Sequence, residues 1–475
     1  MVASGFVGRI QELTQLREFI AQPESGLAVI YGRRRVGKTR LIAELLEATP
    51  VLLFEGLEER PTRDQINHFL FQLQPYVESL KFRGKRPSTW KEALLLLLEA
   101  LKASPRPVVL DEFQWMANYR HELVSDLKYV WENFLAKLPG QKLILCGSIA
   151  SFMLEKVINS RALYGRVDVR LSLPGFRLRE SQELLADKGE AEVLEAHLLT
   201  GGIPKYLKLL GEGPSVQLAI QKHAFTPNSY FVTEYRSIFA SHFGKNPDFQ
   251  NIVRALAAHP LGLSREQLIE KAKLDSGGYL TEQLRDLESV GFIRAAAPIH
   301  KAAKGSQVKY FLIDAYLRFH FDFLLPNLNK IQSGRENLFA HIVQSGAFHA
   351  WMGRAFEYTC IQHAHLISTL LGFSGIDYTV GPYFVPSRRG ESQGVQIDLV
   401  FDRPDNVMTA CEIKYGSRPV GVEVIPEMER KVQLLEAVAG RKTIHKVLIV
   451  KEPVSQELAR RMYFYRIIRA DELFQ

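Results

Sequence analysis

The run from 27 to 42, LAVIYGRRRVGKTRLI, constrains the fold more than any other part of the sequence. Its apolar start, 27–31, predicts a buried strand, and the pattern from 39 to 48 predicts a helix. The turn between them contains four residues with a fixed spacing: Gly32, Gly37, Lys38 and Thr39. This spacing between a strand and a helix defines the Walker A phosphate-binding loop. The chain is therefore expected to bind a nucleoside triphosphate.

The residues of this loop have separate tasks in holding phosphates. Gly32 and Gly37 allow the backbone to turn its N–H groups inward, and the helix that follows adds its positive end. Lys38 can reach the β- and γ-phosphates, and the Thr39 hydroxyl can ligate Mg²⁺. We expect nucleotide contacts from six residues: Gly32, Val36, Gly37, Lys38, Thr39 and Arg40.

A second apolar run, 107–110, is followed by Asp111 and Glu112. An apolar strand that ends in two acids downstream of a Walker A loop predicts the Walker B motif. Asp111 is expected to hold Mg²⁺, mostly through water, and Glu112 to orient and deprotonate the attacking water.

The composition bounds the compartment and the partners. The length of 475 residues suggests about three domains, and 46% apolar content is ordinary for a globular chain. The net charge of +8 permits a polyanionic partner without requiring one. Three separated cysteines, no signal-peptide pattern and no apolar run long enough for a bilayer predict a cytoplasmic protein without a membrane association.

Five short motifs together resemble the archaeal-type AAA/STAND ATPase family: the arginine-rich P-loop, Leu-Asp-Glu-Phe, Cys-Gly-Ser, Tyr-Gly-Arg and Gly-Gly-Ile-Pro. The resemblance covers residues 1 to about 325 and implies an ATP-driven switch. It implies that Ser148 senses the γ-phosphate, although Ser148 could instead be a helix N-cap. It also implies that Phe6 and Val7 border the adenine, unless they only precede an ordinary N-terminal helix.

The same resemblance gives roles to two later segments. Arg166 is expected to reach a phosphate, in cis or from a neighbouring subunit, and Arg161 is the alternative candidate. A lone arginine is otherwise usually a solvated surface side chain. The segment 176–247 is expected to form a helical lid in which Gly202 and Pro204 approach the nucleotide, unless they only break a helix.

The segment 248–325 resembles a winged helix-turn-helix, with three helices followed by two strands. In a DNA-binding role, the helix 279–289 would enter a groove, and the wing lysines would lie near phosphate: Lys301, Lys304 and Lys309. Residues 251–320 hold ten Lys/Arg and seven Asp/Glu, a net of only +3. This modest charge also allows a packing or regulatory role.

After a predicted linker, 326–340, the range 341–475 resembles the PD-(D/E)xK nuclease fold of restriction endonucleases. Asp398 lies on one predicted strand, and Glu412 and Lys414 share a face of the next. The resemblance adds Glu357 from the first helix as a further metal ligand. The usual proline before the first acid is absent, since Ile397 precedes Asp398. Gln433 could assist the site or lie on the surface, and an edge strand with alternating charge is the structural alternative.

We therefore predict an α/β protein whose P-loop NTPase core has an AAA+-like parallel sheet. The predicted domains are a P-loop ATPase core (1–175), a helical lid (176–247), a winged helix-turn-helix (248–325), the linker (326–340) and a restriction-endonuclease-like α/β domain (341–475). The expected function is ATP binding and hydrolysis that gates Mg²⁺-dependent DNA cleavage by Asp398, Glu412 and Lys414. The alternative is an ATP-driven signalling or scaffold switch whose C-terminal domain binds DNA or protein without cleaving it. A homo-oligomer or a protein partner fits either function.

Overall fold

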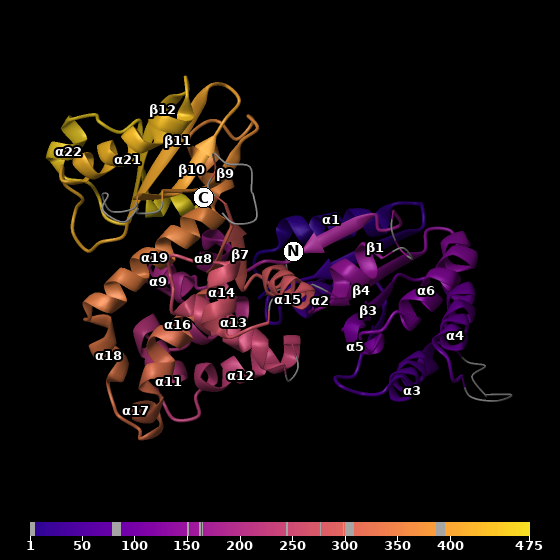
Figure 1. Cartoon of the computed structure of the whole chain (residues 1–475). Coiled ribbons are helices and arrows are strands. Elements are labelled where there is room, and N and C mark those ends of the chain that lie inside the picture. Colours follow the sequence, from indigo (N-terminus) through magenta and orange to yellow (C-terminus); the bar gives the residue numbers. More distant parts are fainter. Residues whose placement is uncertain are drawn as a thin grey trace. The chain divides into compact units, whose positions relative to one another are not determined.

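The computed structural model describes residues 5–77, 87–149, 152–160, 163, 165–243, 246–275, 277–297, 299, 308–385 and 395–475 (Figure 1). The chain divides into two compact units, Met1–Gly175 and Phe176–Gln475, called unit 1 and unit 2 below.

Unit 1 is built on a five-stranded sheet in the order β2-β3-β4-β1-β5. All of its strand pairs are parallel. The strands are β1 (Gly26–Tyr31), β2 (Leu52–Glu55), β3 (Val108–Asp111), β4 (Lys142–Gly147) and β5 (Val169–Ser172). The four strands β1–β4 coincide with apolar runs in the sequence, whereas the half-buried edge strand β5 alternates polar and apolar residues. A parallel sheet of this kind is typical of a P-loop ATPase and confirms this part of the predicted fold.

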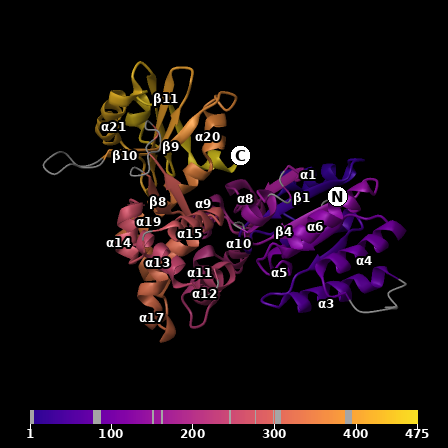
Figure 2. The same cartoon turned by 45° about the vertical axis from the view of Figure 1, so that its right-hand side comes forward.

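The helices of unit 1 cover this sheet with apolar faces. They are α1 (Ile10–Ala21), α2 (Lys38–Ala48), α3 (Thr62–Leu73), α4 (Trp90–Ala103), α5 (Phe113–Met116) and α6 (Glu122–Asn133), with short turns η1 (Gln74–Tyr76), η2 (Leu135–Lys137) and η3 (Met153–Ile158). Helix α4 lies between α3 and α6 (Figure 2). Its N-terminus is fixed by a capping box in which Thr89 and Glu92 exchange hydrogen bonds.

The strand order decides which loops meet in unit 1. Strand β4 lies between β1 and β3, and parallel strands end at the same edge of a sheet. The P-loop after β1, Ser148 after β4 and the acids at the end of β3 therefore share one edge. This edge is where open α/β sheets bind ligands.

Unit 2 begins with five helices: α8 (Leu178–Leu184), α9 (Glu190–Thr200), α10 (Pro204–Leu210), α11 (Val216–Ala224) and α12 (Tyr230–Phe243). A module of helices and short strands follows: α13 (Pro247–Ala257), β6 (Leu263–Ser264), α14 (Arg265–Ala272), α15 (Gly278–Ser289), β7 (Ile293–Ala296) and β8 (Lys309–Leu312). Its sheet has the order β6-β8-β7 and is antiparallel. The elements occur in the predicted order, and the winged-helix designation stays a prediction.

The predicted linker 326–340 is wrong. This range is largely helical, in η6 (Leu325–Asn327), α17 (Leu328–Gln332) and the start of α18 (Leu338–Val343). Ile331 and Leu338 are buried, and the ring of Phe339 stacks on Phe225 with a centroid distance of 5.2 Å. The polar residues that suggested a linker cover the outer surface of this segment, while its few apolar residues join the core of unit 2.

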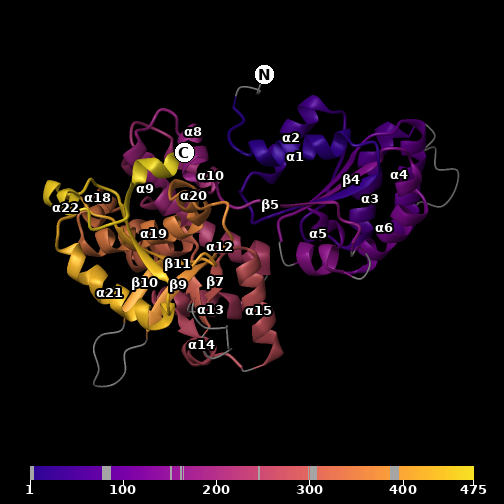
Figure 3. The same ribbon diagram turned by 90° about the horizontal axis from the view of Figure 1, so that it is seen from above.

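The C-terminal part of unit 2 contains a five-stranded mixed sheet in the order β13-β12-β11-β10-β9. The strands are β9 (Thr379–Val385), β10 (Val395–Asp402), β11 (Val407–Lys414), β12 (Thr443–Val450) and β13 (Arg466–Arg469). Pairs among β9, β10 and β11 are antiparallel, and those among β11, β12 and β13 are parallel. Helices α19 (Gly346–Gln362) and α21 (Val424–Ala439) both pack on β10 and β11 (Figure 3).

The remaining elements of unit 2 connect these parts: α16 (Ala315–Phe319), the π-helical η5 (His320–Leu324), α20 (Ala364–Leu370), α22 (Gln456–Arg460) and η7 (Ala470–Phe474). One hydrogen bond links distant segments, because the backbone N–H of Leu178 in α8 donates to Nε2 of His363 at the end of α19 at 3.2 Å. The cysteines Cys146, Cys360 and Cys411 are buried and unbonded. Over the described ranges, no helix has the length and apolar character needed to cross a bilayer.

Candidate functional site

The P-loop forms a backbone cradle at the end of β1. Gly32 and Gly37 have φ angles of 155° and 95°, in the region that favours glycine. A Cβ on Gly32 would lie 2.5 Å from the carbonyl oxygen of Leu173, whereas one on Gly37 would meet nothing within 4 Å. Packing therefore requires glycine at 32, and backbone conformation favours it at 37. Helix α2 begins directly after this turn, at Lys38.

Lys38 lies inside the cradle. Its Nζ donates to the carbonyl oxygens of Gly32 at 2.9 Å and Arg33 at 3.0 Å. The side chain is only 6% exposed, and this burial lowers the pKa of Lys38, while Cys146, Glu112 and Asp111 act in the opposite direction. The ammonium group is thus held by neutral carbonyls, which an anionic ligand can replace.

The Walker A and Walker B side chains meet at the sheet edge. Oγ1 of Thr39 lies 3.5 Å from Oδ2 of Asp111. Burial raises the pKa of Asp111, and a hydrogen bond from the Cys146 thiol partly opposes this. The carboxylate is therefore a poorly solvated anion beside a hydroxyl, an arrangement that a hard cation such as Mg²⁺ would relieve.

Glu112 is held by two neutral side chains. The backbone at Glu112 is left-handed, with φ 49°, and its N–H donates to Oδ1 of Asp111 at 2.8 Å. The Ser148 hydroxyl donates to Oε2 of Glu112 at 2.9 Å, and the Gln114 amide donates to the same oxygen. Ser148 therefore contacts the expected general base rather than standing apart from it.

Two residues of this site, Gln114 and Arg9, were not predicted from the sequence. Gln114 is completely buried, and it also contacts the Ser148 hydroxyl at 3.0 Å and the Ser148 N–H at 3.2 Å. Arg9 is 4% exposed and donates to the carbonyl oxygen of Val36 at 3.2 Å. Its other contacts include the Pro174 carbonyl, so it ties the P-loop to the end of unit 1. Only proximity to the motifs in the sequence could have pointed to either residue.

The other expected nucleotide residues of unit 1 have more ordinary surroundings. The guanidinium of Arg40 lies 5.7 Å from the Phe6 ring, which brings Phe6 close to the start of α2, and Val7 is half-buried next to it. Arg166 is ion-paired with Glu132 on α6. Arg161, the alternative to Arg166, lies outside the described residues.

Gly202 and Pro204 lie in unit 2. Gly202 has φ 72°, and a Cβ there would lie 2.2 Å from the Phe176 carbonyl oxygen. Pro204 is the first residue of α10. Both residues therefore have a clear structural role in the turn between α9 and α10, and their approach to nucleotide stays a prediction.

A second cluster of charged residues lies on the C-terminal sheet. The pairing of β10 with β11, from Leu399↔Cys411 onward, brings the next positions, Asp398 and Glu412, to the same end of the pair. The register between β10 and β9 shifts between Ile397 and Val400, so Asp398 lies at an irregularity of the strand. Such irregularities often redirect a side chain at a functional site.

Glu412 is neutralised by two lysines. Its Oε1 lies 2.9 Å from Nζ of Lys414, and its Oε2 lies 2.6 Å from Nζ of Lys431. Glu427 completes a closed ring, at 2.8 Å from Lys414 and 3.2 Å from Lys431. Burial alone would lower the pKa of Lys414, but contact with Glu412 and Glu427 outweighs it and raises the pKa to about 12.

Glu357 and Asp398 lie beside this ring without belonging to it. Burial, and then the charges of Asp398 and Glu412, raise the pKa of Glu357 to about 8. Burial also raises the pKa of Asp398, although a hydrogen bond from the Gln396 amide at 2.8 Å and the charge of Lys431 oppose this. The structure therefore brings together Glu357, Asp398, Glu412 and Lys414, the four residues expected at this site.

This cluster does not fit a divalent metal as it stands. Within the described part of the chain, no three or more His, Cys, Asp or Glu side chains are arranged to hold a metal ion. The reason is visible in the ring, because both Glu412 oxygens are engaged by ammonium groups. A three-carboxylate metal site would first require Lys431 to move away.

Helix α21 contributes Lys431 and Glu427 to the cluster, and neither residue was predicted from the sequence. Gln433, the residue considered on this helix, is exposed. Glu427 and Lys431 have the i, i+4 spacing that places two side chains on one helix face. This spacing was available in the sequence, but the side of the helix that faces β11 was not.

Lys309 is engaged inside unit 2. It lies 5.1 Å from the Phe384 ring and donates to the Leu261 carbonyl oxygen at 3.3 Å, and burial lowers its pKa. Helix α15 buries Leu284 and Leu287. The other two expected wing lysines, Lys301 and Lys304, lie outside the described residues. These contacts favour the packing role over the DNA-reading role for this module.

Comparison with known proteins finds a family model that matches the first part of the chain. Residues 6–210 match the model of an ATPase domain found predominantly in Archaea. The chain is also 26% identical over 339 residues to the uncharacterized protein MJECL04 of Methanocaldococcus jannaschii, covering 69% of this chain and 71% of that protein.

One solved structure supports the same fold. The Walker-type ATPase PABY2304 of Pyrococcus abyssi is similar with a TM-score of 0.52 and 19% identity, covering 66% of this chain and 96% of that one. The ORC2 protein of Aeropyrum pernix is similar with a TM-score of 0.45 and 17% identity, over 72% of this chain and 98% of that one, too weak a likeness to support an inference. Together with the site geometry, the family model and the similarity to PABY2304 support an archaeal-type ATPase domain at residues 6–210, built on a P-loop ATPase fold.

Proposed function

We propose that unit 1 binds ATP and hydrolyses it. The observation that carries this proposal is the meeting of three loops at one sheet edge: the P-loop with Lys38, the acids Asp111 and Glu112, and Ser148 between them. The P-loop would hold the phosphates through its backbone N–H groups and Lys38. Phe6 and Val7 are the proposed adenine contacts, and Pro204 and Arg166 are further proposed nucleotide contacts.

The donor set at this edge fits Mg²⁺. The Thr39 hydroxyl and the Asp111 carboxylate are adjacent oxygen donors, and Asp111 is buried without a lysine or arginine ion pair among the described residues. When bound with the nucleotide, Mg²⁺ would neutralise charge on the phosphate oxygens. Thr39 would bind it directly, and Asp111 would orient its water ligands.

Glu112 is the proposed general base. A carboxylate in this place can accept a proton from the attacking water and align it. In the present arrangement Ser148 and Gln114 both donate to Glu112, which fixes the direction of its carboxylate. Ser148 and Gln114 are therefore proposed positioning residues that hold the Glu112 carboxylate toward the attacking water.

Steady-state ATP hydrolysis by Glu112→Gln tests this proposal. We expect turnover to fall by at least about 100-fold, while binding of radiolabelled ATP changes little, because Gln keeps the shape but cannot take the proton. Glu122→Gln on α6 is the matched control and should leave turnover unchanged. Turnover within threefold of the parent chain in Glu112→Gln would contradict the assignment.

We also propose that the charged cluster of unit 2 acts on DNA. Four observations favour it: buried acids with raised pKa values, a strand irregularity at Asp398, two lysines able to meet phosphate, and the order of these residues along the chain. In this arrangement the acids do not fit a divalent metal, because both Glu412 oxygens are held by lysines. Lys414 and Lys431 would neutralise a backbone phosphate after releasing Glu412.

The gating of this cluster by ATP belongs to the same proposal. Helix α19 carries Glu357, and the hydrogen bond between His363 and Leu178 ties the end of this helix to α8, in the proposed lid. A nucleotide-dependent movement of α8 would therefore act on the helix that carries Glu357. The second candidate function is a switch in which the cluster binds DNA or protein without cleaving it.

Cleavage of plasmid and single-stranded DNA separates the two candidates. The full chain is incubated with Mg²⁺ or Mn²⁺, with and without ATP, beside Asp398→Ala and the exposed control Asp405→Ala. Cutting that disappears only in Asp398→Ala supports a nuclease, and a dependence on ATP supports gating. No cutting under any condition, with ATP hydrolysis intact, supports the non-cleaving switch.

A further inference from the structure

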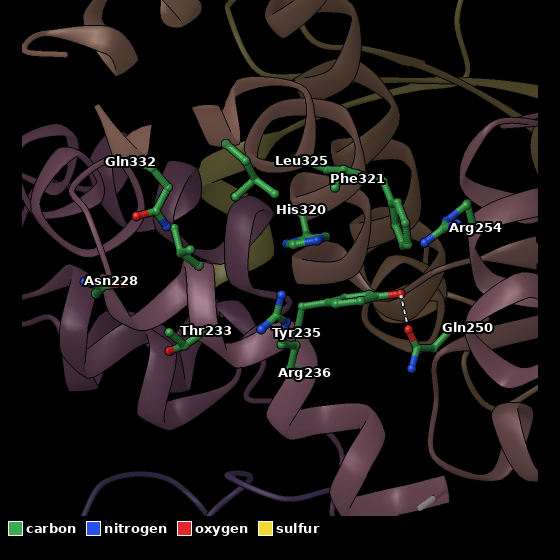
Figure 4. Close-up of a pocket in the computed structure, with 12 residues that line it drawn as sticks. Asn228, Thr233, Tyr235, Arg236, Gln250, Arg254, His320, Phe321, Leu325 and Gln332 are labelled. Atoms are coloured by element: carbon green, nitrogen blue, oxygen red, sulfur yellow. Dashed lines mark hydrogen bonds between the residues drawn. The ribbon is translucent and has the colours of Figure 1, made fainter. Parts of the chain in front are cut away.

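A cavity of about 530 Å³ lies in unit 2, between α12, α13, η5 and α17 (Figure 4). None of the residues discussed above as ATP or DNA contacts lines it. Its volume is within the range of about 300–1,000 Å³ found for small-molecule sites. The π-helical turn η5 borders it, and such turns occur often at functional sites.

The cavity is positively charged. Arg236 from α12 and Arg254 from α13 line it, and no Asp or Glu is among its described lining residues. Within the described part of the chain, neither arginine has a carboxylate at ion-pair distance. Guanidinium groups without an acid partner, presented from two helices, favour an anion, and phosphate above all because two parallel N–H groups match its oxygens.

Another wall of the cavity is aromatic and carries no charge. The rings of Tyr235 and His320 are parallel within 2°, with centroids 4.4 Å apart, and Phe321 meets Tyr235 edge-on at 5.5 Å. Burial lowers the pKa of His320 to about 4, so this imidazole is neutral near pH 7. The wall therefore offers apolar, flat surface to a ring instead of a third positive charge.

Two polar groups of the cavity, on His320 and Gln250, have hydrogen-bonding capacity left for a ligand. His320 is 3% exposed, and its Nδ1 has no hydrogen-bond partner among the described residues. The Tyr235 hydroxyl donates to the Gln250 amide oxygen at 3.5 Å, a long bond that leaves the Gln250 amide N–H groups for another partner. A buried ring nitrogen and a side-chain amide are groups that can recognise the edge of a heterocycle.

We propose that this cavity binds a nucleoside phosphate, with the phosphate on Arg236 and Arg254 and the base against Tyr235, His320 and Phe321. A fatty acid would leave one of the two arginines and the other polar groups unused, and a small dicarboxylate would leave the aromatic wall unused. The same chemistry is offered by a free mononucleotide and by the phosphorylated 5′ end of a nucleic acid strand.

Fluorescence anisotropy with the full chain tests the proposal. The probes are N-methylanthraniloyl-AMP and a short DNA with a 5′ phosphate and a 3′ fluorophore. AMP is chosen because it lacks the β- and γ-phosphates that Lys38 would hold. We expect Arg236→Ala and Arg254→Ala each to weaken binding by about 10-fold or more. Arg335→Ala, at an exposed position nearby, is the matched control and should bind normally.

Two further variants make the result decisive. Thr233→Trp fills the exposed rim without changing charge and should abolish binding, with circular dichroism melting as the check on folding. Lys38→Ala should retain AMP binding, which separates this cavity from the P-loop. Binding of AMP alone identifies a free nucleotide, and binding of the DNA alone identifies a strand end. Failure to bind either probe, or binding as tight in both arginine variants as in the parent chain, overturns the proposal.

Discussion

Lys38 of unit 1 and Lys431 of unit 2 are equally buried, at 6% and 7% exposed, but their partners differ. Lys38 is held by two backbone carbonyls, whereas Lys431 is ion-paired with Glu412 and Glu427. Neutral partners leave the charge of Lys38 available to an incoming anion. Carboxylate partners satisfy the charge of Lys431 internally, so the second site must break its own ion pairs before it can take a phosphate or a metal.

The largest effect on ATP turnover should come from removing the ammonium group of Lys38. Lys38→Ala is expected to reduce ATP turnover by about 1,000-fold, because no other described lysine is held in the P-loop to meet the transferred phosphate. Turnover is measured by phosphate release at saturating ATP. Lys102→Ala, at an exposed pair with Glu99, is the control. ATP turnover within tenfold of the parent chain would show that the charge of Lys38 does not serve an incoming phosphate.

The next effect is on the free energy of unfolding, and it should differ between the Glu412 cluster of unit 2 and the Glu112 site of unit 1. Glu412→Gln should lower the free energy of unfolding of unit 2 by about 3 kcal/mol, since it leaves Lys431 buried with only Glu427 as an acid partner. Glu112→Gln should change unit 1 by less than about 1 kcal/mol, because the partners of Glu112 are neutral.

Urea unfolding monitored by circular dichroism provides the measurement, with Glu436→Gln, exposed on α21, as the control for Glu412→Gln. Equal destabilisation by Glu412→Gln and Glu112→Gln would show that the ion pairs of Glu412 stabilise the fold no more than the neutral partners of Glu112 do.

Lowering the pH from 7 to 5 should destabilise unit 2 more than unit 1, because every buried histidine among the described residues lies in unit 2. Burial lowers the pKa of His197 to about 3. Its stabilising contribution is therefore fully present above the unfolded pKa of 6.5 and falls as the unfolded state gains a proton below that pH. Between pH 7 and pH 5 the loss should be about 2 kcal/mol.

Differential scanning calorimetry from pH 7 to pH 5 measures this, and His197→Gln should flatten the dependence of the unit 2 transition. A transition of unit 2 that is unchanged across this range would contradict the neutral, buried state of the imidazole.

The smallest effect should come from a positioning residue. Ser148→Ala should lower kcat for ATP hydrolysis by about 10-fold with KM nearly unchanged, because Gln114 still holds Glu112. Ser125→Ala on the exposed face of α6 is the control. A large rise in KM instead would indicate that Ser148 binds nucleotide rather than Glu112.

The fold of unit 1 could be predicted well because its strands are nearly continuous apolar runs followed by distinctive loops. Strand β5 could not, because one face of an edge strand carries polar residues such as Arg170. The segment 326–340 was mistaken for a linker because only a few of its residues, among them Ile331 and Phe339, are buried.

The candidate sites could be predicted as lists of residues but not as sets of contacts. The Walker spacing identifies Lys38 and Glu112, since chemistry fixes those positions in the chain. Gln114, Lys431 and Glu427 act through hydrogen bonds and ion pairs across elements, which depend on helix rotation and strand register. The same dependence decided that Glu412 is paired with lysines rather than arranged with other acids for a metal.

The hydrogen bond between Leu178 and His363 has a consequence for how this chain can be divided. Nδ1 of His363 lies 2.8 Å from the Thr359 carbonyl, so Nδ1 carries the hydrogen and Nε2 accepts from Leu178. Neither group can keep its partner if the chain is cut before α19. The part of the chain from α19 onward is therefore not an independent module. In a gene fusion or domain exchange it would have to be kept together with the segment that begins at Phe176.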